Sequence, residues 1–315
     1  MSIADVGVGL DVAFGFGIET TPGTRVAPDT FCYITQESLS RNQEFIRNPG
    51  LGGGRQILRS KKVGAYNPGG DVSMVFGTAE AANILRWVLG GNPSASGSDP
   101  YTRAFAGLGD LPSATLQKVV PYGGGSQPFD FLGAYCASAT FEQSAGEYLS
   151  LRASTLAYDV VTDQTAATFA PPSDEQLLTF QDVAVTIRGG SAECFDSFDL
   201  TIDNGISGTT KTCAADAGRP SIRQSGMRSV TGTLRDDFKD MNRYNDMVAG
   251  TEGALVFTYT GENSSSLTIS LNVFFTSETP QVSGPGEVKQ GVPFEVLHPT
   301  ADASAITFTL VNGES

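Results

Sequence analysis

Residues 69–89 read G-G-D-V-S-M-V-F-G-T-A-E-A-A-N-I-L-R-W-V-L, and this stretch joins a predicted strand to a predicted helix. The strand is Gly70–Phe76, which is enriched in β-branched and aromatic residues. The helix is Ala79–Leu89, which Thr78 is expected to cap and Gly90-Gly91 to end. Threonine accepts a hydrogen bond from a free first-turn amide, and glycine permits a left-handed turn at the end of a helix.

A similar succession occurs in the second half of the chain. The strand-like stretch S-V-T-G-T-L (229–234) precedes a second predicted helix, which Asp237 or Phe238 opens and Gly250 ends. Apolar residues of this helix fall at positions i, i+3 and i+7 and form one stripe, Met241, Tyr244 and Val248.

Each of these strands is preceded by another strand and by a Gly-rich basic stretch. The first basic stretch contains Arg41, Arg47, Arg55, Arg59, Lys61 and Lys62, and the second contains Lys211, Arg219, Arg223 and Arg228. A Gly-Arg step occurs in both, at Gly54-Arg55 and Gly218-Arg219. Because order, charge and spacing recur, we infer a diverged duplication of one unit that consists of strands, a long basic loop, a strand, a helix and more strands.

The predicted boundary between the two units lies in the polar segment Thr162–Glu175. Pro171-Pro172 cannot join the interior of a sheet, so the segment is expected to be a linker. The units are then residues 1–172 and 173–315. The alternative is that two β-rich halves resemble each other by chance.

The remaining sequence predicts a mainly β protein. Its 37 glycines and 16 prolines, with few helical patterns, are typical of short strands joined by turns. Further predicted strands are Phe31–Ile34, Phe131–Phe141, Glu147–Val161, Asp182–Ile187, Phe195–Ile202, Ala254–Tyr259, Ser266–Phe275 and Ala305–Val311.

Charge argues against a nucleic-acid-binding protein. The net charge is −14, so the chain should repel a polyanion rather than neutralise its phosphates. The basic stretch 41–62 on such an acidic subunit favours docking against the acidic face of the next identical copy. We therefore predict contacts between subunits at nine basic residues, Arg41, Arg47, Arg55, Arg59, Lys61, Lys62, Arg219, Arg223 and Arg228.

No motif predicts catalysis, a cofactor or a metal site. The chain has one histidine, His298, and neither a G-x-S-x-G serine motif nor a phosphate-loop spacing. Asp203-Asn204-Gly205 lacks the glutamate that completes a calcium loop and predicts a turn. The cysteines Cys32, Cys136, Cys194 and Cys213 form no Cys-x-x-Cys pair and are expected to be buried thiols. We predict neither a transmembrane helix nor a signal peptide.

Several segments, in their order along the chain, resemble the tail tube proteins of siphophages, the long-tailed bacteriophages. The N-terminal ones are G-F-G-I-E-T-T-P-G-T (15–24), a strand ending in E-S-L (37–39), the Gly-Arg loop, and G-G-D-V-S-M-V-F (69–76) followed by I-L-R-W-V-L-G (84–90). The later ones are F-L-G-A-Y-C-A-S-A-T-F (131–141), S-F-D-L-T-I-D-N-G-I (197–206) and S-V-T-G-T-L-R-D-D-F (229–238).

This resemblance implies a β-sandwich or half-barrel with one flanking helix in each unit. Six such folds join edge to edge around a lumen, long loops reach the adjacent ring, and DNA passes through the tube without specific binding. If one chain carries two folds, three chains supply six and form a pseudo-hexameric ring; hexamers of chains are the alternative. The expected partners are further copies of the chain, the tape measure protein, the tail terminator and the distal tail protein, in a virion tail assembled in the host cytoplasm, with no membrane.

Two other functions are compatible with a β-rich chain. One is another virion structural protein, such as a tail terminator or a capsid decoration protein. The other is a carbohydrate-binding or hydrolytic β-sandwich protein, which needs clustered surface aromatics or a carboxylate dyad. The single tryptophan, Trp87, lies inside an apolar helix and does not supply such a surface.

Overall fold

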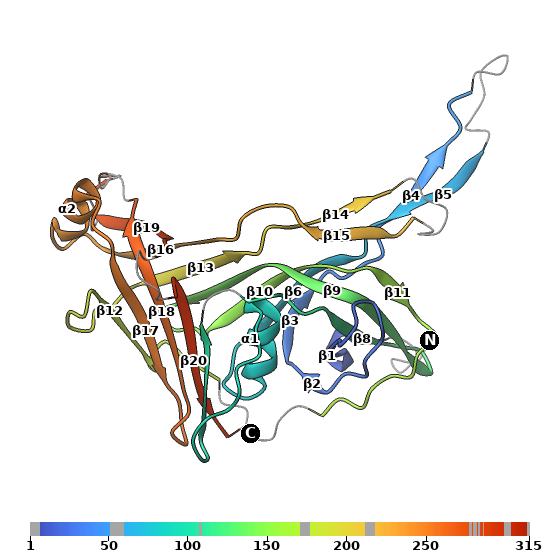
Figure 1. Ribbon diagram of the computed structural model, residues 1–315, viewed down its shortest axis with the longest axis horizontal. Coiled ribbons are helices and arrows are strands. Elements are labelled where there is room, and N and C mark those ends of the chain that lie inside the picture. Colours follow the sequence, from blue (N-terminus) through green and yellow to red (C-terminus); the bar gives the residue numbers. More distant parts are fainter. Residues whose placement is uncertain are drawn as a thin grey trace.

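The structure, a computed structural model, describes residues 7–50, 60–106, 109–170, 177–211, 218–276, 279, 282, 284–285, 287–298 and 304–313. Over these residues the chain is mainly β, with one large antiparallel sheet and two α-helices (Figure 1). The predicted β-rich fold is confirmed.

The first half contains a short 3₁₀-helix, strands β1 to β11 and helix α1. Their bounds are η2 Gly9–Asp11, β1 Ala13–Ile18, β2 Thr30–Phe31, β3 Ile34–Glu37, β4 Gln43–Arg47, β5 Lys61–Tyr66, β6 Gly69–Val75, α1 Ala81–Leu89, β7 Tyr101–Ala106, β8 Ala114–Tyr122, β9 Gly125–Ser144, β10 Ser150–Leu156 and β11 Asp159–Val161.

The second half contains strands β12 to β20 and helix α2. Their bounds are β12 Val183–Ile187, β13 Ser197–Asp203, β14 Ile206–Thr210, β15 Pro220–Gln224, β16 Ser229–Asp237, α2 Asn242–Ala249, β17 Gly253–Thr260, β18 Ser266–Phe275, β19 Lys289–Val296 and β20 Ile306–Asn312. Because β19 pairs with β16 and β18, and β20 with β18, the residues after Pro280 contribute strands to the sheet of this half.

Strand pairing follows the same path in both halves. In the first half the neighbours run β1-β8-β9-β10-β6-β3, with β11 added beside β9. In the second half they run β12-β17-β18-β19-β16-β13, with β20 added beside β18. All these pairs are antiparallel. In sequence, the hairpin β4–β5 lies between β3 and β6, and the hairpin β14–β15 lies between β13 and β16.

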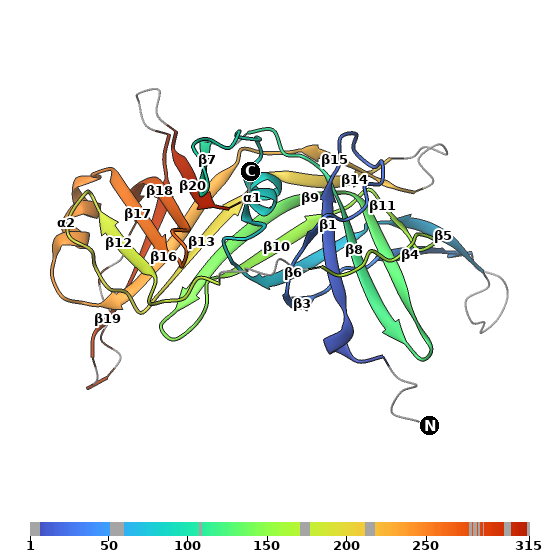
Figure 2. The same ribbon diagram turned by 90° about the horizontal axis from the view of Figure 1, so that it is seen from below.

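The two halves join into one sheet rather than standing apart. β9 is long enough to pair with β8 near its start and with β13 of the second half near its end, from Ser138 to Ser144. A second junction pairs β7 with β20. Figure 2 shows β9, β10, β13 and β16 running side by side across the middle of the molecule.

One hydrophobic core spans both halves. The ring of Phe141 on β9 contacts Phe76 of the first half, with centroids 5.5 Å apart, and Phe308 of the second, at 5.4 Å. Helix α1 lies in this core, where Trp87 packs against Phe16 and its indole N–H donates to the Ala134 carbonyl at 3.1 Å. Burial of these rings is the main apolar stabilisation that the fold provides.

Both helices end at the predicted glycines, but their starts differ from the prediction. Gly90 and Gly250 are the C-caps, with φ of 81° and 60°. Glu80, not Thr78, is the N-cap of α1; Thr78 is buried, and its carbonyl accepts a hydrogen bond from Asn312 Nδ2 at 2.8 Å. The prediction that Thr78 caps the helix was therefore wrong.

The start of α2 was also predicted too early. Asp237 belongs to β16, where it pairs with Lys289 of β19, and the helix begins at Asn242. The predicted apolar stripe faces outward, since α2 has no buried residue and Met241 and Val248 are 48% and 66% exposed. By contrast, α1 buries six of its nine residues.

Candidate assembly surfaces

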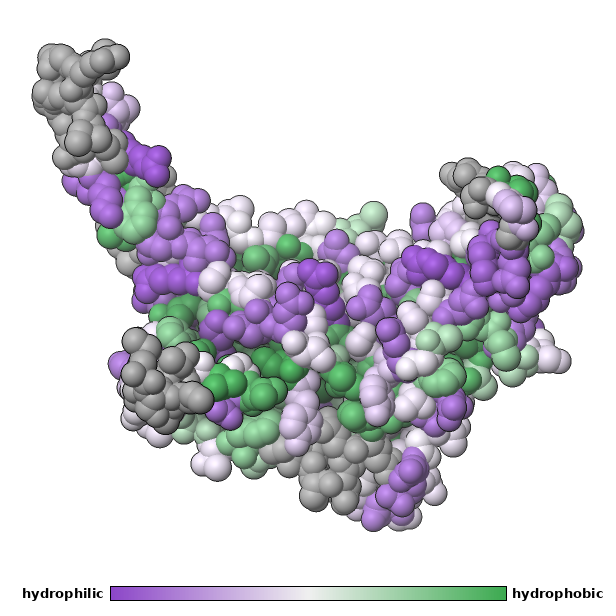
Figure 3. All heavy atoms as spheres, turned by 180° about the vertical axis from the view of Figure 1, so that it is seen from behind, coloured by the Kyte–Doolittle hydropathy of each residue, from purple (hydrophilic) through white to green (hydrophobic). Residues whose placement is uncertain are grey.

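The β4–β5 hairpin projects from the body and is called the arm below (Figure 1). Phe45, Ile46 and Val63 are 49%, 65% and 70% exposed on it. Across the hairpin Ile46 pairs with Lys62 and Arg47 with Lys61, and all three of these basic residues are exposed. Figure 3 shows the arm as a mostly hydrophilic projection with a small hydrophobic patch. Exposed apolar side chains with basic residues around them are typical of a surface that another protein covers.

The arm is anchored where β5 meets the second hairpin. The Tyr66 N–H donates to the Gly218 carbonyl at 3.1 Å, and the buried Tyr66 hydroxyl donates to Asp159 at 2.7 Å. Arg219 forms an ion pair with Asp159 at 2.7 Å, and the Arg41 guanidinium lies 4.1 Å from the centre of the Tyr66 ring. Arg41 and Arg219, predicted as contacts between subunits, thus make intramolecular contacts that hold the arm to the body.

Two pKa shifts accompany this anchor. Burial, reinforced by the hydrogen bond to Asp159, raises the pKa of Tyr66 above its ordinary value of 10.0. The hydrogen bond to the Asp159 carboxylate raises the pKa of Arg219. The proton on the tyrosine and the charge on the arginine are both stabilised by the same carboxylate.

The other predicted basic contacts are divided between exposed and partly buried positions. Arg223 on β15 is exposed, and its Nε donates to Ser221 Oγ at 3.1 Å. Arg228 is partly buried in a pocket that Asp110 and Tyr135 also line, and this burial lowers the pKa of Arg228. Arg55 and Arg59 lie outside the residues that the structure describes.

One face of the large sheet is polar across both halves. Facing residues on six neighbouring strands form a continuous rung on it, Glu295, Thr231, Thr201, Thr140, Arg152 and Ser73. The hydroxyls of Thr140 and Thr201 lie 3.0 Å apart where the halves meet. The opposite side chains of the same strands, such as Phe141 and Leu200, are fully buried.

The cations on this polar face are paired with acids. Arg152 forms an ion pair with Asp71, whose pKa is lowered by that hydrogen bond, and Arg235 pairs with Asp199 at 2.7 Å. Exposed Glu142 and Glu295 add negative charge to the face. Its surface is therefore rich in hydroxyl groups and net acidic.

Chemistry-bearing groups are sparse elsewhere. The described residues include no group of three or more His, Cys, Asp or Glu side chains that could hold a metal ion. Neither described helix is long and apolar enough to cross a membrane. Cys32 and Cys136 are buried, and burial raises the pKa of Cys136 to about 12. Cys194 is exposed, which corrects the prediction of a buried thiol there, and Cys213 lies outside the described residues.

Comparison with protein families decides the assignment. Residues 9–296 match the family described as phage tail tube protein. The chain belongs to the phage tail tube protein family. A search of curated proteins finds no match. Membership makes the chain a structural component of a phage tail that assembles with itself into a tube, as the resemblance in its sequence implied.

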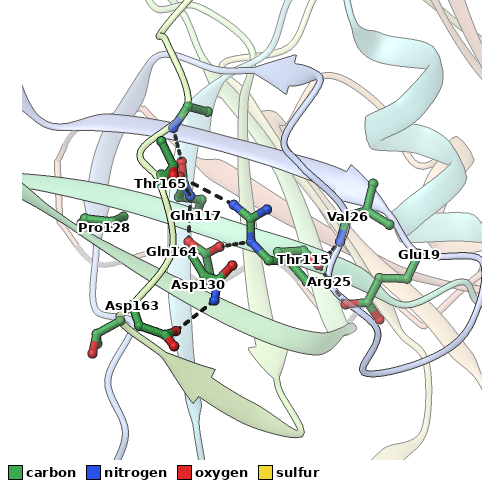
Figure 4. Close-up of polar contacts among 12 residues, drawn as sticks. Glu19, Arg25, Val26, Thr115, Gln117, Pro128, Asp130, Asp163, Gln164 and Thr165 are labelled. Carbon is green, nitrogen blue, oxygen red and sulfur yellow. Dashed lines mark hydrogen bonds and ion pairs between the residues drawn. The ribbon is translucent and has the colours of Figure 1, made fainter.

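This tail tube protein contains a buried polar network that the sequence did not predict (Figure 4). Glu19 accepts four hydrogen bonds, from the N–H groups of Gly23 and Gly133 and the hydroxyls of Ser113 and Thr115, at 2.7 to 2.9 Å. The only signal was its place in the segment 15–24, because three of its four partners, Ser113, Thr115 and Gly133, are distant in sequence.

A second buried acid lies nearby. Asp130, fully buried on β9, accepts hydrogen bonds from Arg25 and Gln117, both at 2.6 Å. Arg25 and Gln117 also donate to the Thr165 carbonyl, so this pair ties the chain that leaves the first half back onto the sheet (Figure 4). In both networks the two carboxylate oxygens have hydrogen-bond partners, which join loops to strands β8 and β9.

Proposed function

We propose that this chain is the major tail tube subunit of a long-tailed phage and that it carries two tandem tail tube folds, residues 1–172 and 173–315. Three chains form a pseudo-hexameric ring, and stacked rings form a hollow tube through which genomic DNA passes into the host.

The observation that carries this proposal is the repeated strand path. Two paths of six strands with the same pairing, the same position of the hairpin and the same position of the helix occur in one chain. A single ancestral unit explains that coincidence. The junction between β9 and β13 supports edge-to-edge joining of units, because it already joins two of them within the chain.

The arm supports stacking of rings. It carries exposed Phe45, Ile46 and Val63 beside basic residues, while the body of the subunit is acidic. Burial of the three apolar side chains against the next ring contributes affinity, and charge attraction orients the contact. The contact is heterologous, so it adds rings without limit along one axis.

The polar face of the sheet suits the wall of the lumen. It carries hydroxyl groups and acids, and its arginines Arg152 and Arg235 form ion pairs with Asp71 and Asp199. A polyanion gains no counterion release from such a surface and is free to slide.

The remaining partners follow from the position of a tube in a tail. They are the tape measure protein, the tail terminator and the distal tail protein. The tube is a part of the virion tail, assembled in the host cytoplasm, and requires neither a membrane nor a cofactor.

Negative-stain electron microscopy of the purified protein tests the proposal. We expect hollow, unbranched tubes with a regular axial repeat. Solid fibres, or particles that stay monomeric at all concentrations and salt conditions, would count against a tube subunit.

A further inference from the structure

Among the strand edges that have no described neighbour, two occupy the places that β13 and β9 occupy where the two halves join. β3 ends the path of the first half, and among the described residues it pairs only with β6. On β18, the edge that pairs with β17 has no described strand beyond Val273. In the strand path of the first half, β9 has the place that β18 has in the second. The edge of β9 that pairs with β8 is covered further along by β13.

We infer that β3 of one copy pairs antiparallel with the end of β18, residues Phe274–Thr276, of a second copy, in the register of β13 with β9. This inference rests on the proposed function, because it supplies the seam between chains of one ring. The contact joins two different edges, so it is heterologous and closes when the rotation per copy divides a full turn.

The register follows from counting strand pairs from each hairpin. Ser40–Gly69 is the pair next to the arm, and Asp203–Ser229 is the pair next to β14–β15. Three pairs further from the hairpins are Glu37–Val72 and Leu200–Gly232. Glu37 therefore corresponds to Leu200, and Leu39 corresponds to Ile202.

The receiving strand is aligned through the same rungs. In the first half Val72 faces Ala153 of β10, which faces Ala139 of β9. In the second half Gly232 faces Phe294 of β19, which faces Phe275 of β18, so Phe275 corresponds to Ala139. Ala139 faces Ile202 in the junction within the chain. The seam then places Phe275 opposite Leu39 of the next copy and Thr276 opposite Ser38, as Thr140 lies opposite Thr201.

The backbone of Leu39 is oriented for this pairing. The N–H groups of Ser38 and Ser40 donate to the carbonyls of Asp71 and Gly69 on β6. Because backbone groups alternate along a strand, the N–H and C=O groups of Leu39 point away from β6. In the second half, the Asn204 N–H donates to the Ala137 carbonyl of β9, which by alternation directs Ile202 toward β9 as well.

In the single chain, two side chains form hydrogen bonds with the backbone N–H and C=O groups of Leu39 that point away from β6. The Leu39 N–H donates to Glu37 Oε2 at 2.8 Å, and Lys118 Nζ donates to the Leu39 carbonyl at 2.7 Å. Lys118 also pairs with Glu37 at 3.0 Å. The second half has the buried Leu200 where the first has Glu37, so the charged pair is confined to the open edge.

This Glu37–Lys118 pair, the edge guard, takes the place of a neighbouring strand. Open strand edges recruit other chains indiscriminately, and charged side chains at the edge suppress this. When the end of β18 of the next copy forms hydrogen bonds with the N–H and C=O groups of Leu39, the edge guard releases them. Free subunits therefore resist random strand pairing, whereas a copy in the correct register can join the ring.

A disulfide tests the seam. In a background with Cys194→Ser and Cys213→Ser, we introduce Ser38→Cys and Thr276→Cys, which are exposed positions. Facing residues of a non-hydrogen-bonded antiparallel pair have Cα atoms about 4.5 Å apart, within reach of a disulfide. Oxidation of assembled protein should yield covalently linked chains that stop at the trimer on a non-reducing denaturing gel, and mixing the two single variants should yield covalent dimers only.

Two control variants make a negative result interpretable. Thr140→Cys with Thr201→Cys has the same geometry within one chain and should close without linking chains. Gln36→Cys with Thr276→Cys is out of register and should link poorly. Wild-type tubes with no covalent species from the Ser38/Thr276 pair would overturn the seam and leave the proposed function standing, whereas a wild type without tubes would overturn both.

The guard is tested separately with Lys118→Met, which keeps the aliphatic stem and removes the ammonium group. The unpaired subunit loses the hydrogen bond from Lys118 to the Leu39 carbonyl and the ion pair with Glu37, so the concentration at which light scattering detects assembly should fall roughly tenfold. Lys239→Met, which removes the ion pair with Asp236 away from this edge, should leave the onset unchanged. An onset for Lys118→Met at or above that of the wild type would overturn the guard.

Discussion

At the scale of single residues, a buried acid within a short motif joins segments that are far apart in the sequence. Glu19 is 6% exposed and satisfies four donors from three separate segments of the first half. A carboxylate placed in this way costs desolvation, and its hydrogen bonds offset that cost only while all of them form. The motif around residues 15–24 is therefore a structural anchor of the loop that follows β1.

Replacing Glu19 with alanine should destabilise the subunit. Four donors lose their acceptor in a place that water reaches poorly, so we expect the free energy of unfolding to fall by about 3 kcal/mol or more. Chemical denaturation followed by circular dichroism measures this. Glu142→Ala, at an exposed position on the polar face, serves as the control and should change stability by less than about 0.5 kcal/mol. Equal effects of the two substitutions would contradict the anchoring role.

Tyr66 predicts a dependence of stability on alkaline pH. Its folded pKa is raised above 10.0 by burial and by the bond to Asp159. The resulting stabilisation is complete below the unfolded pKa of about 10 and is lost as pH rises toward the folded value. Tyr66→Phe should therefore flatten part of the loss of stability above pH 10, as measured by urea unfolding at several pH values. Tyr135 and Tyr259, whose pKa values are raised by burial as well, contribute to the remaining loss.

At the scale of elements, local chemistry predicted most strands and the ends of both helices. The alternation in β18 is a clear case, because every second residue from Leu267 to Phe275 is buried. Gly90 and Gly250 ended the helices as expected, since a left-handed backbone at those points needs glycine.

The starts of the helices could not be predicted, because long-range contacts decide them. Thr78 is held by Asn312, which is distant in sequence, and so it does not cap α1. Asp237 stays in β16 because its neighbour across the strand is Lys289, which also binds Asp196. Such tertiary contacts override the local preference of an acidic residue for the first turn of a helix.

The arm gives the prediction that belongs to this scale. Reversing its charge with Arg47→Glu, Lys61→Glu and Lys62→Glu should abolish tube growth and leave the subunit folded, because these side chains project into solvent. Pelleting and electron microscopy measure growth, and circular dichroism checks folding. The swap Arg47→Lys, Lys61→Arg and Lys62→Arg keeps the charge and should still form tubes. Normal tubes from the reversed variant would remove the docking role of the arm.

At the scale of the whole molecule, the sequence indicated that the two halves share an order of elements, but not how the halves meet. The order of strand, basic loop, strand and helix was visible in both halves. The junction was not, because it depends on β9 being long enough to hold β8 and β13 at different points along its length. Likewise, nothing in the basic loops indicated that Arg219 of the second would anchor the arm of the first.

The composition of one ring tests the central claim most directly. If each chain carries two folds, as we propose, a ring contains three copies, so cryo-electron microscopy of the tubes should yield rings with threefold symmetry and six similar but distinct lobes. The map should place β3 of each copy beside β18 of its neighbour. A ring of six whole chains, or lobes that do not alternate between the two halves, would contradict the account.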